Sequence, residues 1–303
     1  MSALLALADD IAADRRISAE DALRVRKDIF PDGVVSRQEA DVLIALEGRV
    51  HDSDEAWAQA FVEALSDHVL QAGTYPGHVD ECASAWLRAS FAHDRPSKTE
   101  LEALVNIVER AGSTPASLQS LTRERIYRFV AGRAMTAADV DFVRRCVYAN
   151  AAVGDAEMQW LFALDAECDG RANDPAWRDL FVKAALCHVA GRRAPATLEA
   201  DMMLAREARF AEPRPGVTPL SLVKSIFKGG LGGYVARARA PGWVEGMEDR
   251  YEEANAGAED DAKLTVAEIA AMLGFSEADG KLTENEQALM AELHKLEAEQ
   301  AAG

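Results

Sequence analysis

Basic residues are scarce in this sequence. Its 33 Lys and Arg residues are outnumbered by 51 Asp and Glu residues, which gives a formal net charge of -18 at pH 7. Nucleic-acid binding is driven by Lys and Arg side chains that neutralise phosphates. The charge balance therefore argues against a nucleic-acid partner and favours cations, basic proteins or basic peptides.

Uninterrupted apolar runs and closely spaced cysteines are also missing. No window has the roughly 18 apolar residues that a membrane span needs. The short N-terminal apolar run has no basic region before it and has Asp9 and Asp10 behind it, unlike a signal peptide. The 4 cysteines lie far apart and form no CxxC motif, which favours reduced thiols. We expect a cytoplasmic protein.

The familiar catalytic and nucleotide-binding motifs do not occur. There is no HExxH, GxSxG or Walker loop, and the glycines of Gly229–Gly233 lack the Lys-Ser/Thr that a phosphate loop needs. His68 and His188 occupy equivalent positions in two predicted helices, each at the same distance after a Phe-Val pair. Such a histidine is more often packed than catalytic. No complete catalytic constellation is visible, so the sequence specifies no reaction.

The apolar periodicity is helical almost throughout. In Leu101–Ala111 the aliphatic residues recur at helical steps, and no stretch of comparable length alternates with a period of two. Gly and Pro gather between these runs, above all in Pro213–Gly246. The sequence predicts an all-α protein.

The chain also repeats itself. Ile17–Val50 matches Met135–Cys168, and after a short insertion Asp54–Val69 matches Asp174–Val189. The shared residues include Trp57/Trp177, Phe61/Phe181 and His68/His188. Shared aromatic positions at helical spacing indicate that one core is built twice.

The later parts of the two copies correspond more loosely, 79–108 with 264–296. We predict two tandem helical modules, residues 1–131 and 132–303, the second with a Gly/Pro-rich insertion at about 194–260. A third hairpin at 264–293 is the alternative, but two modules also account for the remaining helices.

Two acidic turns have the same pattern, DGVVSRQEADVL and DGKLTENEQALM. In each, a Ser or Thr and a Glu three residues later form the capping box that starts a helix. The turns also resemble the second half of a calcium loop, but an early ligand position is lost to Phe in both. Two interpretations stay open: the turns only cap helices, or they also bind calcium or another divalent cation weakly.

The same turns carry a family resemblance. The repeated unit resembles the TerB-like module of tellurite-resistance protein TerB and the co-chaperone DjlA. It consists of a helix, a turn of the pattern DG-x-(Val/Leu)-(Ser/Thr)-x-x-Glu, and a second helix. The Trp-x-x-x-Phe-Val motifs resemble bacterial relatives of TerB. The resemblance implies an acidic, non-enzymatic helical module linked to stress response, carboxylate cation binding and assemblies at the inner membrane face. The residues that match its acidic turn are Asp32, Glu39, Asp279 and Glu286.

The insertion contains a locally basic stretch. Leu220–Trp243 has basic and aromatic residues but no acidic residue. It is either an internal strap on the acidic modules or a segment that docks a protein partner or a membrane surface. The residues expected to bind a partner are Lys224, Phe227, Lys228, Tyr234, Arg237, Arg239 and Trp243.

Two functions from different classes remain. The first is a stress-related regulatory or scaffolding protein that binds partner proteins. The second is a metal-dependent helical enzyme that uses the acidic cluster at 165–174, with Asp165, Glu167 and Asp169 as ligands. A metal enzyme needs a fixed set of ligands and supporting contacts. The first function needs no further ligands, and we favour it.

Overall fold

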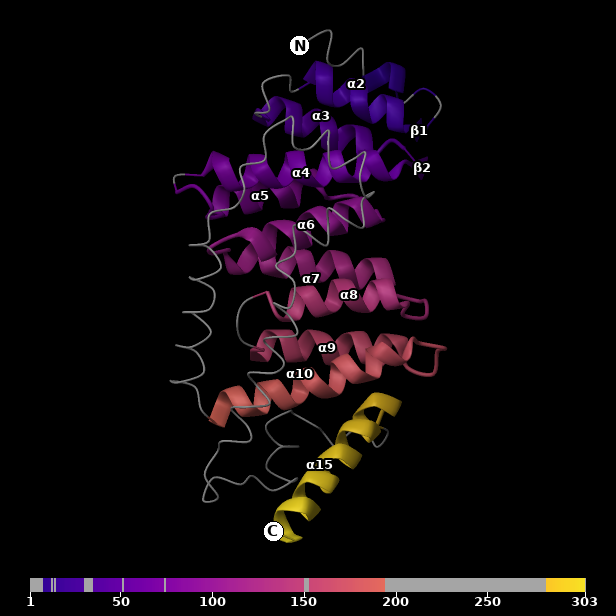
Figure 1. The fold of residues 1–303 in the computed structure, drawn as a ribbon, viewed down its shortest axis with the longest axis vertical. Coiled ribbons are helices and arrows are strands. Elements are labelled where there is room, and N and C mark those ends of the chain that lie inside the picture. Colours follow the sequence, from indigo (N-terminus) through magenta and orange to yellow (C-terminus); the bar gives the residue numbers. More distant parts are fainter. Residues whose placement is uncertain are drawn as a thin grey trace, which may run out of the picture. The chain divides into compact units, whose positions relative to one another are not determined.

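The structure is a computed structural model, and it is helical over nearly all of the residues that it describes (Figure 1). This confirms the all-α prediction. The described residues are 8–11, 13, 15–29, 35–50, 52–73, 75–149, 153–193 and 282–302. Within them, no helix is long and apolar enough to cross a membrane.

The chain divides by its internal contacts into two units. Among the described residues, the boundary between them falls between Phe129 and Val130. Each unit has its own core, as expected for folding units of this size, and the two are described separately.

The first unit is built around α4 (Glu55–Ala72), which packs against α2 (Ala19–Ile29), α3 (Arg37–Glu47) and α6 (Lys98–Arg110). Figure 1 shows the helices of this unit following one another as neighbouring layers. Its other elements are β1 (Arg16–Ile17), β2 (Asp52–Ser53), α5 (Glu81–Ser90) and α7 (Ala116–Val130). The two strands pair in parallel, with Arg16 opposite Asp52.

The core of this unit consists of residues that recur at helical steps on α4. Trp57, Phe61 and Leu65 are fully buried there, and Leu104 and Ile107 of α6 are buried as well. Residues three and four apart lie on one helix face, so this spacing buries one continuous stripe of α4.

The second unit is built around α10 (Pro175–Arg193). This helix packs against α8 (Ala137–Val147), α9 (Asp155–Cys168) and α15 (Glu284–Ala302). Trp177 and Phe181 of α10 are buried, and so are Leu289 and Leu293 of α15. The last described helix therefore contributes its apolar face to the core of this unit, although it lies far along the chain from α10.

Polar residues fix where the helices begin. Ser36 and Glu39 form a capping box at the start of α3, and Thr136 and Asp139 form another at α8. Each such cap satisfies helical N–H groups that have no partner within the helix and contributes about 1 kcal/mol. The capping prediction at Ser36 is thus confirmed.

Candidate functional site

The carboxylates predicted at the acidic turns act as helix caps. Glu39 Oε2 accepts a hydrogen bond from the Ser36 backbone N–H at 2.7 Å, and Glu286 Oε2 accepts one from the Thr283 N–H at 2.7 Å. Asp32 and Asp279 lie outside the described residues. The structure therefore gives these two Glu residues a local structural role, and cation binding by the four residues stays a prediction.

The other predicted acidic cluster is not gathered around a common point. Glu167 Oε1 accepts from the Gly132 N–H at 3.1 Å, and Asp169 Oδ1 accepts from the Glu284 N–H at 3.3 Å. Asp165 points into the core instead. Within the described parts of the chain, no group of three or more His, Cys, Asp or Glu side chains is placed to hold a metal ion. The geometry gives the metal-enzyme alternative no support.

The predicted basic docking segment lies outside the residues that the structure describes. This applies to all of its named residues, Lys224, Phe227, Lys228, Tyr234, Arg237, Arg239 and Trp243. Its role stays a prediction.

Asp165 is the centre of a buried junction between three helices. Its carboxylate accepts from Trp177 Nε1 at 3.0 Å and from Asn285 Nδ2 at 2.6 Å, and it also accepts from the hydroxyl of Thr283. Burial raises the pKa of the Asp165 carboxyl, while its three donors favour the ionised form. The side chain thereby joins α9 to α10 and α15.

The first unit contains a junction of the same design at Glu47. Its carboxylate accepts from Trp57 Nε1 at 2.6 Å and from Ser97 Oγ at 2.6 Å. Ser97 is the N-cap residue of α6, just as Thr283 caps the start of α15. In both units, a carboxylate near the end of one helix therefore holds the Trp of the next helix and the capping hydroxyl of a later helix.

Two further bonds recur between the units. His68 Nδ1 lies 2.7 Å from the Val35 carbonyl, and His188 Nδ1 lies 2.7 Å from the Val153 carbonyl. The N–H of Asp54, just before α4, donates to Ile17 O at 2.8 Å. The N–H of Asp174, just before α10, donates to Met135 O at 2.8 Å. Both histidines thus hold a neighbouring loop, which agrees with the packed role predicted for them.

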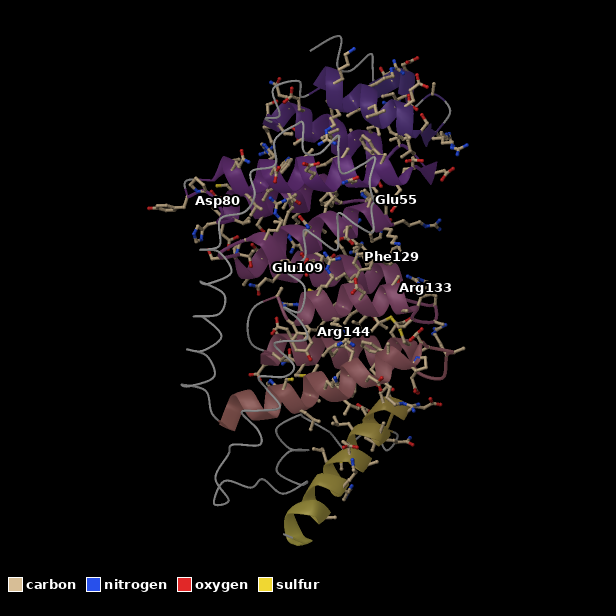
Figure 2. The ribbon with its side chains drawn as sticks, in the orientation of Figure 1. Glu55, Asp80, Glu109, Phe129, Arg133 and Arg144 are labelled. Atoms are coloured by element: carbon tan, nitrogen blue, oxygen red, sulfur yellow. The ribbon has the colours of Figure 1, made fainter. Side chains whose placement is uncertain are left out.

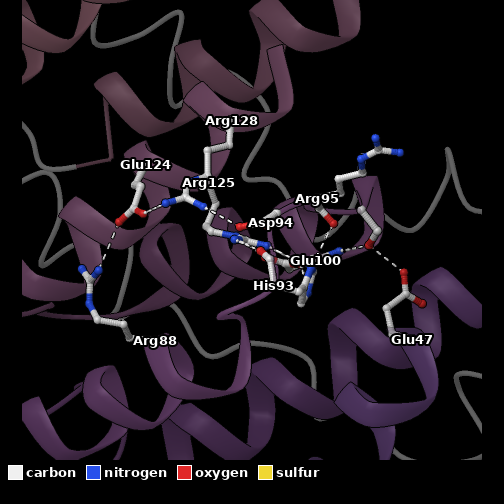
Figure 3. A network of polar contacts seen from close by, with 10 residues as sticks. Glu47, Arg88, His93, Asp94, Arg95, Glu100, Glu124, Arg125 and Arg128 are labelled. Carbon is white, nitrogen blue, oxygen red and sulfur yellow. Dashed lines mark hydrogen bonds and ion pairs between the residues drawn. The ribbon is translucent and has the colours of Figure 1, made fainter. Parts of the chain in front are cut away.

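A second polar network in the first unit surrounds Glu100 (Figure 3). The side chains of Glu100 and Arg125 are 1% and 2% exposed, and Arg125 Nε donates to Glu100 Oε1 at 2.7 Å. Burial raises the pKa of Glu100, and the guanidinium of Arg125 opposes that rise. A buried charge needs such a partner, because water is not available to it.

His93 connects this buried pair to the surface. Its Nε2 lies 2.9 Å from Glu100 Oε2, and its Nδ1 lies 3.0 Å from the Arg95 carbonyl. Its own carbonyl accepts from Arg125 at 2.5 Å. Both ring nitrogens already face protein atoms, so neither is directed at a substrate as a general base must be.

A surface pocket in the first unit lies where two helix connections meet. Its volume is about 350 Å³, and its described lining residues are Tyr75, His78, Val79, Asp80 and Ser113. His78 Nδ1 lies 2.8 Å from Ser113 Oγ, and the Val79 N–H donates to Ser113 O at 3.0 Å. In Figure 2, Asp80 is labelled at the outer edge of the helices. This pocket is a candidate binding site within the described part of the first unit.

Sequence reasoning did not identify this pocket or the two carboxylate junctions. Along the sequence, the glycines at 73–77 and 112 indicate only breaks between helices. Their pairing in space depends on the packing of α4 and α6, which no local pattern reports. Glu100, three residues after a Ser, fits a capping box, but its side chain turns to Arg125 instead.

Comparison with known proteins adds no family assignment. No family model, no curated protein and no solved structure matches this chain.

Proposed function

We propose that the protein is a duplicated, TerB-like helical scaffold that binds protein partners and is not an enzyme. The observation that carries the proposal is the carboxylate junction that both units contain, at Glu47 and at Asp165.

The duplication accounts for the correspondence between the units. The residues of each junction fall at matching positions of the two predicted copies, including the indole donors Trp57 and Trp177. The helices pair as α3 with α9, α4 with α10 and α6 with α15. The division of contacts between Phe129 and Val130 also suits two modules.

The partners of the buried carboxylates support a role without catalysis. The carboxylates of Glu47 and Asp165 accept from core donors, and Glu100 is paired with Arg125. Perturbed groups that serve catalysis face a cleft where a substrate can reach them. These groups instead connect helices to one another.

The charge of the chain indicates the class of partner. With a net charge of -18, the protein attracts positively charged partners over long range, and the attraction weakens as salt screens it. We therefore propose a basic protein or a basic peptide segment as the partner. The stress-related role and location at the inner membrane face follow from the TerB-like resemblance and belong to the same proposal.

A peptide array tests the proposal. The full chain is offered basic peptides of equal net charge and different sequence at physiological salt. We expect a subset to bind, because a scaffold recognises shape and spacing as well as charge. Binding that depends only on net charge, or no binding at all, would overturn it.

The metal-enzyme alternative has its own measurement. Native mass spectrometry after incubation with manganese or zinc checks for stoichiometric metal. Uptake that is lost in Asp169→Asn but kept in Asp155→Asn would favour the enzyme over the scaffold.

A further inference from the structure

We propose that the pocket lined by Tyr75, His78, Val79, Asp80 and Ser113 binds an arginine side chain of the partner protein. This inference rests on the proposed function and names the site and the recognised chemistry.

The pocket is held in shape by its backbone. The connection after α4 and the connection after α6 are joined by a hydrogen bond from the Gly112 N–H to Gly77 O at 2.7 Å and by a bridge between His78 and Ser113. Gly77 has a φ of +85°, a conformation that a side chain disfavours. A preformed pocket loses little conformational entropy when it binds.

The imidazole of His78 forms one wall because Gly112 has no side chain. A Cβ at Gly112 would lie 3.1 Å from His78 Cε1, closer than a normal contact. The hydrogen bond between His78 Nδ1 and Ser113 Oγ also restrains the ring. The position of the His78 ring therefore depends on Gly112 and Ser113.

Tyr75 supplies an aromatic face at the rim. Its side chain is 72% exposed, more than any other large hydrophobic residue in the described regions. Cations are attracted to the face of an aromatic ring, and the flat guanidinium of arginine stacks on it. An exposed Tyr beside a pocket is typical of a binding site, where its ring gains contact area at low entropic cost.

Asp80 supplies the negative charge. It is the charged residue among the described lining residues when His78 is neutral. Asp80 Oδ1 caps α5 through the Ala83 N–H at 2.8 Å, and Oδ2 has no partner within the described residues. A carboxylate oxygen accepts strongly from a guanidinium N–H.

The same charges argue against an anionic ligand. The start of a helix favours anions through its free N–H groups and its dipole. At α5, however, Asp80 and Glu81 already lie in this position. An added phosphate or carboxylate would therefore meet like charge, whereas an arginine meets opposite charge.

The size of the pocket also fits. A volume of about 350 Å³ lies at the small end of the range for ligand pockets, about 300–1,000 Å³. This suits one side chain with its adjoining backbone better than a large cofactor.

The test is an NMR titration of the full chain with Nα-acetyl-arginine amide and with its neutral isostere, Nα-acetyl-citrulline amide. We expect saturable shifts of the Gly77, Gly112 and Ser113 amides with the arginine compound. Binding of the citrulline compound should be at least fivefold weaker, because it keeps the shape and loses the charge.

Two Asp→Asn variants separate the site from bulk charge. Asp80→Asn keeps the helix cap, since Asn caps as well as Asp, and removes the local charge. Asp54→Asn does the same at the start of α4, where Asp54 Oδ1 accepts from the Ala56 N–H at 2.8 Å. It lies roughly 27 Å from the pocket along the 18-residue helix. We expect at least fivefold weaker arginine binding in the first variant and no change in the second.

Three results would overturn the inference. These are equal binding of both compounds, equal weakening by both variants, and shifts of the pocket amides by inorganic phosphate instead of arginine. The fate of the scaffold proposal is separate. If array peptides bind wild type and Asp80→Asn equally, the scaffold proposal is supported and this site is not. If the arginine compound binds but no array peptide does, this site is supported and the scaffold proposal is not.

Discussion

Removing Arg125 should destabilise the first unit strongly. Arg125→Met keeps much of the side-chain volume and deletes the guanidinium that pairs with Glu100. Both side chains are at least 98% buried, so the Glu100 carboxylate would stay buried without its main partner. Breaking a buried pair in this way costs about 3–5 kcal/mol. His93 contacts the same carboxylate but is 41% exposed, and we expect it to compensate only in part.

The destabilisation caused by Arg125→Met should depend on pH. Burial raises the pKa of Glu100 above its unfolded value. The folded state therefore holds more protons than the unfolded state between these two pKa values, and stability falls as the pH rises through that window. Arg125 opposes the rise, so its loss moves the folded pKa higher and widens the window. The destabilisation should be larger at pH 8 than at pH 5, where the carboxyl is closer to its protonated form.

Urea unfolding at both pH values, followed by circular dichroism, measures this effect. Arg128→Met is the matched control on α7, because Arg128 is 43% exposed and pairs with Glu124 at 2.9 Å. Exposed pairs contribute about 1 kcal/mol or less. Adding Glu100→Gln to Arg125→Met should recover part of the loss, since the buried charge is then gone. An Arg125→Met cost that equals the control, or that does not change with pH, refutes the reasoning.

Three further results are expected. Asp165→Ala leaves the buried Trp177 N–H without its acceptor, which should lower the free energy of unfolding by about 1–3 kcal/mol, measured by thermal or urea unfolding. Asp165→Asn keeps an acceptor oxygen and should cost less. An equal loss of stability in both variants would contradict the role of this junction. Excess calcium should leave the melting temperature unchanged, whereas ligand at 100 times its dissociation constant adds about 2.7 kcal/mol; a rise that disappears in Glu39→Gln and Glu286→Gln would show that the caps bind the ion. Residues 220–243 should gain protection from hydrogen exchange on binding a partner or anionic vesicles, and unchanged partner capture after their basic residues are replaced by Ser would indicate a strap.

The helices and their starts could be predicted because their signals are local. The apolar spacing of Leu101–Val108 lies within α6, and the capping box joins Ser36 to Glu39, three residues later. Trp57 and Trp177 are expected in a core because they stand at helical spacing among other apolar residues, and both are buried. Such features depend on neighbours along the chain, which a sequence shows directly.

The roles of the acidic residues could not be predicted in the same way. Asp165 stands in a run that looks like a metal loop, yet its partner Thr283 is 118 residues away. Ser97 is likewise 50 residues from Glu47. A buried carboxylate and a metal ligand use the same residue type, and only the donors that tertiary packing brings together distinguish them.

The two junctions give each unit a spectroscopic reporter of its own. The indole N–H groups of Trp57 and Trp177 are buried and donate to carboxylates, so their proton resonances should lie downfield and exchange slowly with solvent. The Trp160 indole is buried with no partner in the described structure and provides an internal comparison. Because each resonance is lost only when its own helices separate, the opening of the two units can be timed independently in one unlabelled sample.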